Sequence, residues 1–177
     1  MIISVFGGSE PKPESPAYEE AYQLGQLIAS SGQTVMTGGY MGTMEAVSRG
    51  AKEQGGHVIG VTCEEIEAWR PVGPNPWVIE EVRCKTLRER LDYLTRECDC
   101  AMALPGGAGT LAEIMLMWNQ MLIQAIPVVP MILIGIGWRA VLQDSMTKHF
   151  NDYIHDDHQQ MLSYADTPDH AVQLINQ

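Results

Sequence analysis

The sequence is short of basic residues: 11 Lys and Arg stand against 22 Asp and Glu in 177 residues, a formal net charge of −11 at pH 7. Nonspecific nucleic-acid binding depends on clustered Lys and Arg that release counterions from the phosphate backbone. We therefore expect no nucleic-acid partner. A small anionic ligand is compatible with the charge, because a few backbone N–H groups and one or two arginines suffice for a local positive site.

Long apolar runs are also missing. The longest one, residues 123–136, contains Gln124 and two prolines, and it is shorter than the roughly 20 residues that cross a bilayer. We expect no secretory signal before the four cysteines. The sequence thus predicts a soluble, cytoplasmic protein without membrane association.

Cysteine motifs are absent as well. The four cysteines show no CxxC spacing, which favours reduced thiols. Cys98 and Cys100 flank Asp99, but a metal role for them is the less favoured interpretation. Four of the five histidines lie beyond residue 148 without metal-ligand spacing. We expect these histidines at the surface and no metal or other cofactor.

Short apolar, β-branched segments alternate with amphipathic ones. Strands are predicted at 1–6, 34–37, 57–62, 100–104 and 127–135. Helices are predicted at 17–30, 43–55, 86–97, 110–120, 138–150 and 167–176, with an irregular excursion at 64–75 and no assignment for 158–163. Apolar strands separated by helices imply a mainly parallel sheet covered on both faces. The prediction is a single α/β domain over residues 1–177, a doubly wound, Rossmann-like three-layer sandwich.

Glycine clusters follow three of the predicted strands: Gly7-Gly8, the Gly38-Gly39-Gly42 group, and the Gly106-Gly107-Gly109 group. Ligands of such folds bind at the carboxyl ends of the strands, so these clusters should gather on one edge. Neither GxGxxG nor GxxxxGK[ST] occurs in these turns, so a dinucleotide or Walker-type site has no motif support. The residues alone leave two alternatives open: ordinary tight turns, or a site for a mononucleotide-sized phosphate ligand.

Several motifs carry a resemblance to a known family. LPGGAGTLAE resembles the PGGxGTxxE signature of the LOG family, the cytokinin-activating nucleoside 5′-monophosphate phosphoribohydrolases once labelled "possible lysine decarboxylases". VFGGSE, GGYMGTMEAV and GGHVIGVT resemble further motifs of that family, so the similarity extends over about residues 1–135. LRERL stands where the family has MHERK; it keeps Glu89 and Arg90 but departs from the family's pattern at its other positions.

The resemblance implies that Arg90 and Glu113 are the catalytic pair. From the residues alone, the favoured interpretation of Glu113 is a capping-box partner of Thr110, and that of Arg90 is part of a solvated helix face. Two interpretations of Arg88 stay open: a surface residue or a residue that contacts the substrate. Glu45, which stands where the family has glycine, adds a carboxylate near the site.

The resemblance also implies a phosphate on the PGGAGT turn and a nucleotide along the other two glycine turns. The expected substrate-binding residues are Gly8, Ser9, Gly39, Gly42, Met44, Gly106, Gly107, Gly109 and Thr110. Met117, Trp118 and Met121 on the following helix are interpreted as core, with contact to the base or to a second subunit as the alternative.

The expected activity is cofactor-free hydrolysis of AMP or an N6-modified AMP to free base and ribose 5-phosphate, by a homodimer. The rival is a noncatalytic carrier of a nucleotide or of the molybdenum cofactor on the same fold. Lysine decarboxylation is disfavoured, because no lysine stands beside a glycine turn to hold pyridoxal phosphate.

Overall fold

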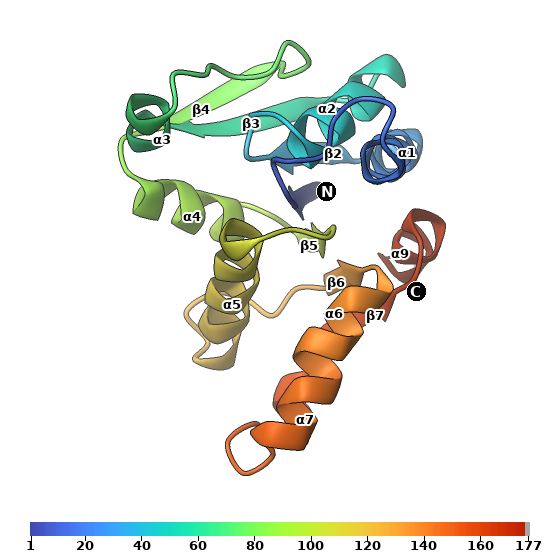
Figure 1. Cartoon of the computed structure of the whole chain (residues 1–177), viewed down its shortest axis with the longest axis vertical. Coiled ribbons are helices and arrows are strands. Elements are labelled where there is room, and N and C mark those ends of the chain that lie inside the picture. The colour runs from blue at the N-terminus through green and yellow to red at the C-terminus, as the bar shows by residue number, and fades with distance from the viewer. Residues whose placement is uncertain (176–177) are drawn as a thin grey trace.

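The computed structural model describes residues 1–175, which form a seven-stranded sheet with helices on both faces (Figure 1). The strands are β1 Ile2–Phe6, β2 Thr34–Thr37, β3 Val58–Cys63, β4 Glu80–Cys84, β5 Cys100–Ala103, β6 Met131–Ile134 and β7 Leu162–Ala165. All neighbouring strands pair in parallel, in the order β4-β3-β2-β1-β5-β6-β7. The predicted doubly wound α/β fold is therefore confirmed.

The strand order reverses at β1, which pairs with β2 on one side and β5 on the other. The turns after β1 and β5 thus leave the sheet towards opposite faces and open a crevice between them, the place where ligands bind in such folds. Gly8 N donates to Pro105 O (3.2 Å) and holds the two turns together.

Helices α1 Pro16–Ser30, α2 Thr43–Glu53 and α9 Pro168–Ile175 cover one face of the sheet. Helices α4 Leu87–Arg96 and α5 Ala108–Leu122 cover the other, together with a continuous helical segment made of α6 Ile136–Trp138, a π-helical stretch over residues 139–144, and α7 Ser145–His149. Two short helices complete the described chain, α3 Glu64–Trp69 and α8 Asp156–Gln159. No helix among residues 1–175 is long and apolar enough to cross a membrane.

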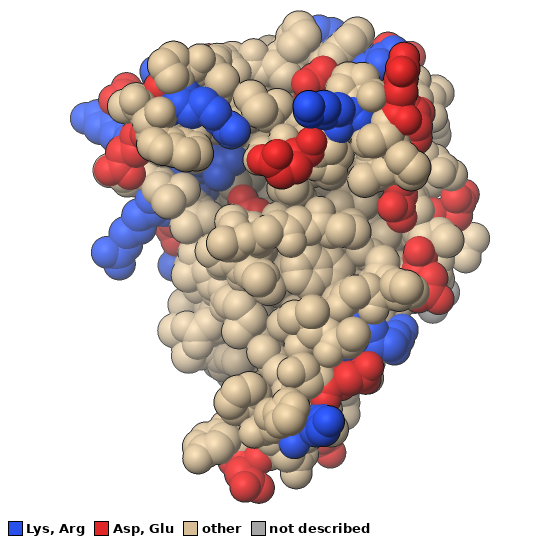
Figure 2. All heavy atoms as spheres, viewed as in Figure 1, with Lys and Arg blue, Asp and Glu red and all other residues tan. Residues whose placement is uncertain are grey.

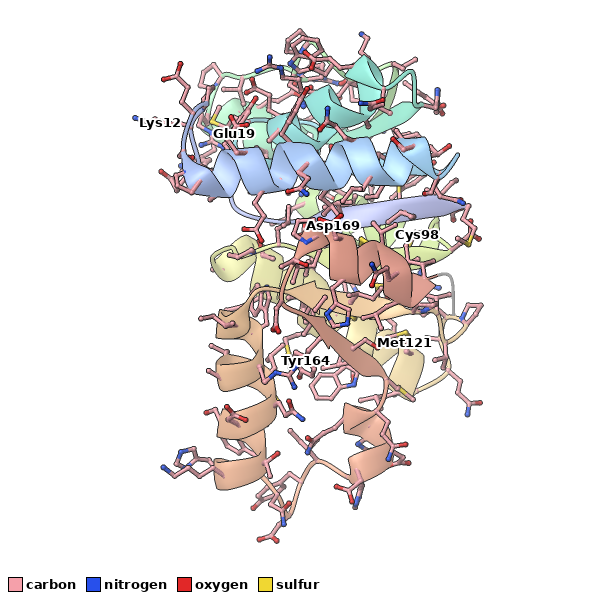
Figure 3. All side chains as sticks on the ribbon, turned by 90° about the vertical axis from the view of Figure 1, so that its right-hand side faces the viewer. Lys12, Glu19, Cys98, Met121, Tyr164 and Asp169 are labelled. Carbon is pink, nitrogen blue, oxygen red and sulfur yellow. The ribbon has the colours of Figure 1, made fainter. Side chains whose placement is uncertain are left out.

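Helices α1 and α2 pack so closely that glycine is required at their contact. A Cβ on Gly25 would lie 2.1 Å from Val47 O, and one on Gly50 would lie 2.0 Å from Tyr22 O. Figure 3 shows α9 beneath α1, where Gln23 Nε2 donates to Asp169 Oδ2 (2.8 Å). On this face of the sheet, close contact between the backbones of α1 and α2 contributes to the packing together with the buried side chains.

The structure adds two strands that the sequence did not predict, β4 and β7, which form the two edges of the sheet. In β4 only Cys84 is fully buried, and in β7 exposed Ser163 interrupts the buried ends. Edge strands need no continuous apolar run, so their sequence signal is weak. The predicted irregular excursion contains α3, and the predicted residue Asn176 of the last helix lies outside the described residues.

Candidate functional site

A pocket of about 350 Å³ opens at the carboxyl ends of the strands, where the strand order reverses. Its lining comes from five turns or helices that are far apart in the sequence. The lining residues are Gly7, Gly8, Ser9, Glu10, Tyr40, Met44, Ile66, Trp69, Arg70, Arg90, Gly107, Ala108, Gly109, Thr110 and Glu113. On the face shown in Figure 2, both basic and acidic side chains gather around a hollow in the upper half, whereas the centre of the lower half carries no charged side chains. The volume suits a ligand of nucleotide size.

One side of this pocket is formed by the turn over residues 106–110 at the start of α5, which we call the phosphate turn after its predicted ligand. The helix begins at Ala108, two residues before the predicted start, with Gly107 as its N-cap. Within residues 1–175, no amide of the phosphate turn donates to a protein acceptor. These N–H groups and the positive end of the helix dipole are therefore available to an anion.

Gly106 does not line the pocket, but it allows the phosphate turn to pack closely against its neighbours. A Cβ at this position would lie 2.1 Å from Thr110 Oγ1 and 3.0 Å from Gly8 N. A Cβ on Gly107 or Gly109 would meet nothing within 4 Å. The first glycine is thus needed for the close approach of two turns, and the other two leave room at the pocket surface.

Arg90 lies on the inward face of α4 and is only 5% exposed. Its Nε donates to Val61 O (2.8 Å) and its Nη2 to Gly38 O (3.1 Å), while the guanidinium lies over the Tyr40 ring at 5.6 Å. These contacts fix the cation against the carboxyl ends of β2 and β3. The interpretation of Arg90 as part of a solvated face is wrong, because α4 packs that face onto the sheet.

Glu113 faces Arg90 across the pocket floor. It is 8% exposed, and its Oε1 lies 3.7 Å from Arg90 Nη1, which is an ion pair too long for a hydrogen bond. Burial raises the pKa of Glu113 to about 7, although the nearby Arg90 charge lowers it. Among the described residues no donor hydrogen-bonds to this carboxylate, so its oxygens can accept from a ligand.

The capping-box interpretation of Glu113 is also wrong. Because α5 starts at Ala108, Glu113 lies in the second turn, and the N-cap has no side-chain hydrogen bond. A capping box forms instead at α4, between Thr86 and Glu89. Glu89, the other residue retained in LRERL, therefore caps a helix.

The loop after β2 positions other parts of the pocket through its glycines. Gly39 and Gly42 have φ angles of 77° and 73°. Gly39 O accepts from the backbone and side-chain amides of Asn75 (2.8 and 3.1 Å). A Cβ on Gly42 would lie 2.5 Å from Gly8 O. Both glycines hold neighbouring loops together.

Tyr40, in the same loop, is 2% exposed and lines the pocket. Its hydroxyl accepts from Cys63 N (2.7 Å) and lies 3.2 Å from Cys63 O and 3.4 Å from Glu67 Oε1. It therefore ties the start of α3 to the ring that supports Arg90.

Eight of the eleven predicted site residues line the pocket: Gly8, Ser9, Met44, Arg90, Gly107, Gly109, Thr110 and Glu113. Gly39, Gly42 and Gly106 do not line it and have the packing roles described above. The catalytic and binding roles of all eleven stay predictions.

Sequence reasoning missed a part of the pocket that we call the α3 wall, namely Ile66, Trp69 and Arg70. Trp69 is 78% exposed, and the Arg70 guanidinium lies 5.4 Å from its ring centroid. The sequence signal that could have predicted the α3 wall is a tryptophan followed by an arginine, shortly after the predicted strand 57–62.

Other expectations are settled by burial. Arg88 is exposed outside this pocket, and Glu45 accepts from Tyr18 Oη (3.2 Å) between α1 and α2. Met117, Trp118 and Met121 are buried in the core against the sheet, which confirms the core interpretation.

Cys98 does not line the pocket. Burial and the neighbouring Asp99 raise the pKa of Cys98 to about 12. Figure 3 shows Cys98 on the opposite side of the view from Lys12, which belongs to the loop after β1. No group of three His, Cys, Asp or Glu side chains that could hold a metal occurs in the described part of the chain.

Comparison with curated proteins finds plant relatives. A probable cytokinin riboside 5′-monophosphate phosphoribohydrolase of Oryza sativa subsp. japonica is 36% identical over 130 residues, 71% of this chain and 52% of that protein. A cytokinin riboside 5′-monophosphate phosphoribohydrolase of Arabidopsis thaliana is 30% identical over 129 residues, 71% of this chain and 60% of that protein. The chain spans about half the length of the curated relatives it matches.

Among solved structures, the molybdenum cofactor binding protein of Rippkaea orientalis superposes with a TM-score of 0.77 and 26% identity, over 99% of this chain and 94% of that one. The molybdenum cofactor carrier protein of Chlamydomonas reinhardtii gives a TM-score of 0.73 and 25% identity, over 99% and 95% of the two chains. The family model described as the SLOG cluster4 family matches residues 1–172. The chain therefore belongs to the SLOG cluster4 family, and its resemblance to the LOG family is confirmed.

Proposed function

We propose that the protein hydrolyses the N-glycosidic bond of a nucleoside 5′-monophosphate to free base and ribose 5-phosphate. The observation that carries this proposal is the Arg90–Glu113 pair, buried on the floor of a pocket whose rim offers the unpaired amides of the phosphate turn. Relatives named as phosphoribohydrolases, 30–36% identical, support the same reaction class.

The chemistry follows from the charges in the pocket. Leaving of the base gives the ribosyl C1′ cationic character, which an ionised Glu113 stabilises. Water adds to C1′, the C1′–N bond breaks, and the proton released from the water is transferred to the base. A carboxyl group whose pKa is near 7 suits both charge stabilisation and proton transfer at neutral pH.

Arg90 supplies a fixed positive charge beside Glu113 and the bound substrate. Its guanidinium is held by two carbonyls and the Tyr40 ring, so its position costs no reorganisation when substrate binds. The phosphate turn supplies binding energy distant from the bond that breaks, which orients C1′ over the carboxylate.

The family resemblance makes AMP or an N6-modified AMP the first substrate to test. Purified protein is incubated with AMP, GMP, CMP and isopentenyl-AMP, and ribose 5-phosphate is assayed. Release from at least one of them supports the proposal. A folded protein that releases none from any nucleotide contradicts it.

The second candidate is a noncatalytic carrier of a nucleotide or of the molybdenum cofactor. Solved structures named as molybdenum cofactor binding and carrier proteins, each matched over 99% of this chain, favour it, as does LRERL with its departures from the LOG motif. Tight binding by calorimetry without turnover would select the carrier. A homodimer, a cytoplasmic location and the absence of a cofactor are further parts of the proposal.

A further inference from the structure

The α3 wall has features that the proposed reaction does not use. Arg70 Nε is buried without a hydrogen-bond partner, and no acidic group among residues 1–175 forms an ion pair with Arg70. Its guanidinium lies over the Trp69 indole, a large and 78% exposed side chain at the pocket rim. A buried donor without an acceptor is costly in a folded protein, and a ligand that brings an acceptor removes that cost.

The strand order sets which part of a nucleotide meets this wall. The phosphate turn follows β5, whereas α3 follows β3, and β1 and β2 lie between them. Three strand spacings of about 4.8 Å separate the two positions by roughly 14 Å. The phosphate, ribose and base of one nucleotide bridge such a gap. Arg90 is held at Gly38 O and Val61 O, between the two ends.

We infer that the α3 wall binds the base of the nucleotide, with Trp69 stacking on its ring and Arg70 donating to its edge. This inference rests on the proposed function and narrows its substrate. Trp69 and Ile66 offer the apolar surface on which any base can stack. Arg70 is the group that distinguishes one base from another.

A guanidinium has only donors, and its best match on a purine is the pair of acceptors O6 and N7. Adenine carries an amino group at C6, which is itself a donor and opposes Arg70. The α3 wall therefore selects 6-oxopurine nucleotides over adenine nucleotides. A 6-oxopurine differs from the adenine that the family resemblance implies. LRERL likewise departs from the corresponding motif of the LOG family.

IMP and AMP provide the sharpest test, because they carry a carbonyl and an amino group, respectively, at the same purine carbon. We expect kcat/KM to favour IMP by roughly 10- to 100-fold, the discrimination typical of a bidentate arginine contact. The Arg70→Ala variant should lower the IMP value by that factor and leave AMP nearly unchanged, so that the ratio approaches one. Arg70→Lys, which keeps the charge but not the planar fork, should fall between them.

Arg49→Ala is the matched control. Arg49 also lies over a tryptophan, with its guanidinium 5.6 Å from the Trp77 ring, but outside the pocket. It should leave the IMP/AMP ratio unchanged. Equal turnover of the two nucleotides, a preference for AMP, or equal losses for both in Arg70→Ala would overturn the inference; equal losses would indicate that Arg70 contacts the phosphate or ribose.

A binding measurement separates this inference from the proposed function. If no nucleotide is cleaved, the proposed function fails, but the IMP and AMP dissociation constants of the wild-type protein and Arg70→Ala still decide the role of the α3 wall. Trp69→Leu should weaken both nucleotides by a similar factor, because stacking tolerates every base. Unchanged binding of both in that variant would contradict the stacking role.

Discussion

Arg90 Nη1 and Glu113 Oε1 lie 3.7 Å apart, each side chain at most 10% exposed, and each comes from a different helix packed on the same face of the sheet. The two charges are close enough to stabilise each other and too far apart to consume each other's hydrogen-bonding capacity. The carboxylate of this buried pair therefore stays free to accept a hydrogen bond from a ligand.

Replacement of Glu113 by Gln should abolish most turnover and preserve binding. The change keeps the shape but removes the negative charge that we propose faces C1′, so kcat should fall roughly 10²- to 10⁴-fold with little change in the nucleotide dissociation constant. Ribose 5-phosphate assays and calorimetry measure the two effects. Glu45→Gln, a half-buried carboxylate outside the pocket, is the control and should retain activity. Equal losses of binding and turnover in Glu113→Gln would argue against a catalytic role.

Activity should rise with pH through about 7. Burial raises the pKa of Glu113 to that value, and the ionised form is the one that stabilises the ribosyl cation. A kcat profile between pH 5 and 9 tests this expectation, with protein folding followed in parallel. A kcat that is already at its plateau at pH 5, as expected for a glutamate with an ordinary pKa, would contradict this expectation.

The same pKa shift predicts a pH-dependent difference in stability. The folded protein holds the Glu113 proton up to about pH 7, whereas the unfolded chain loses it near 4.5. Between these values the folded state binds more protons, so rising pH lowers the free energy of unfolding of wild type relative to Glu113→Gln. Above pH 7 the difference is constant. Denaturant unfolding at pH 4, 5.5, 7 and 8 measures it, and a difference that is flat across this range would contradict the shifted pKa.

Two neighbouring glycines of the phosphate turn should respond differently to alanine. Gly106→Ala places a Cβ against Thr110 Oγ1 and Gly8 N and should destabilise the protein by roughly 1–3 kcal/mol. Gly107→Ala meets open space and should leave stability nearly unchanged, although its methyl group faces the pocket and weakens ligand binding. Thermal unfolding and calorimetry separate the two effects. Similar stability losses in both variants would argue against the close approach of the turns.

A second glycine pair tests the contact between α1 and α2. Gly50→Ala directs a Cβ at Tyr22 O and should destabilise the protein despite the better helix propensity of alanine. Gly137→Ala, in α6 with nothing within 4 Å, should stabilise it by up to about 1 kcal/mol. Opposite shifts of the denaturation midpoint are expected. Stabilisation by both substitutions would show that the helices can separate without cost.

Local sequence patterns were enough to predict the parallel sheet and the edge at which the pocket opens. Apolar runs separated by amphipathic segments leave few alternatives to a doubly wound fold. Glycines after β1, β2 and β5 mark the carboxyl ends of these strands, where tight turns approach one another. The edge strands β4 and β7 were not predicted. A strand at the edge of a sheet is less buried than a central one, so it does not require a continuous apolar run. The start of α5 was set by backbone geometry at Gly107, which moved Glu113 out of the first turn.

Which polar residues are buried together follows only from the packing of distant segments. LRERL reads as a solvated helix face, and only the packing of α4 against β3 turns Arg90 inward to Val61 O while Arg88 stays exposed. The α3 wall lies more than 30 residues from Glu113 in the sequence, and it reaches the same pocket because strand order brings both to one edge. Burial and strand order are properties of contacts between distant segments, so periodicity along the chain does not contain them.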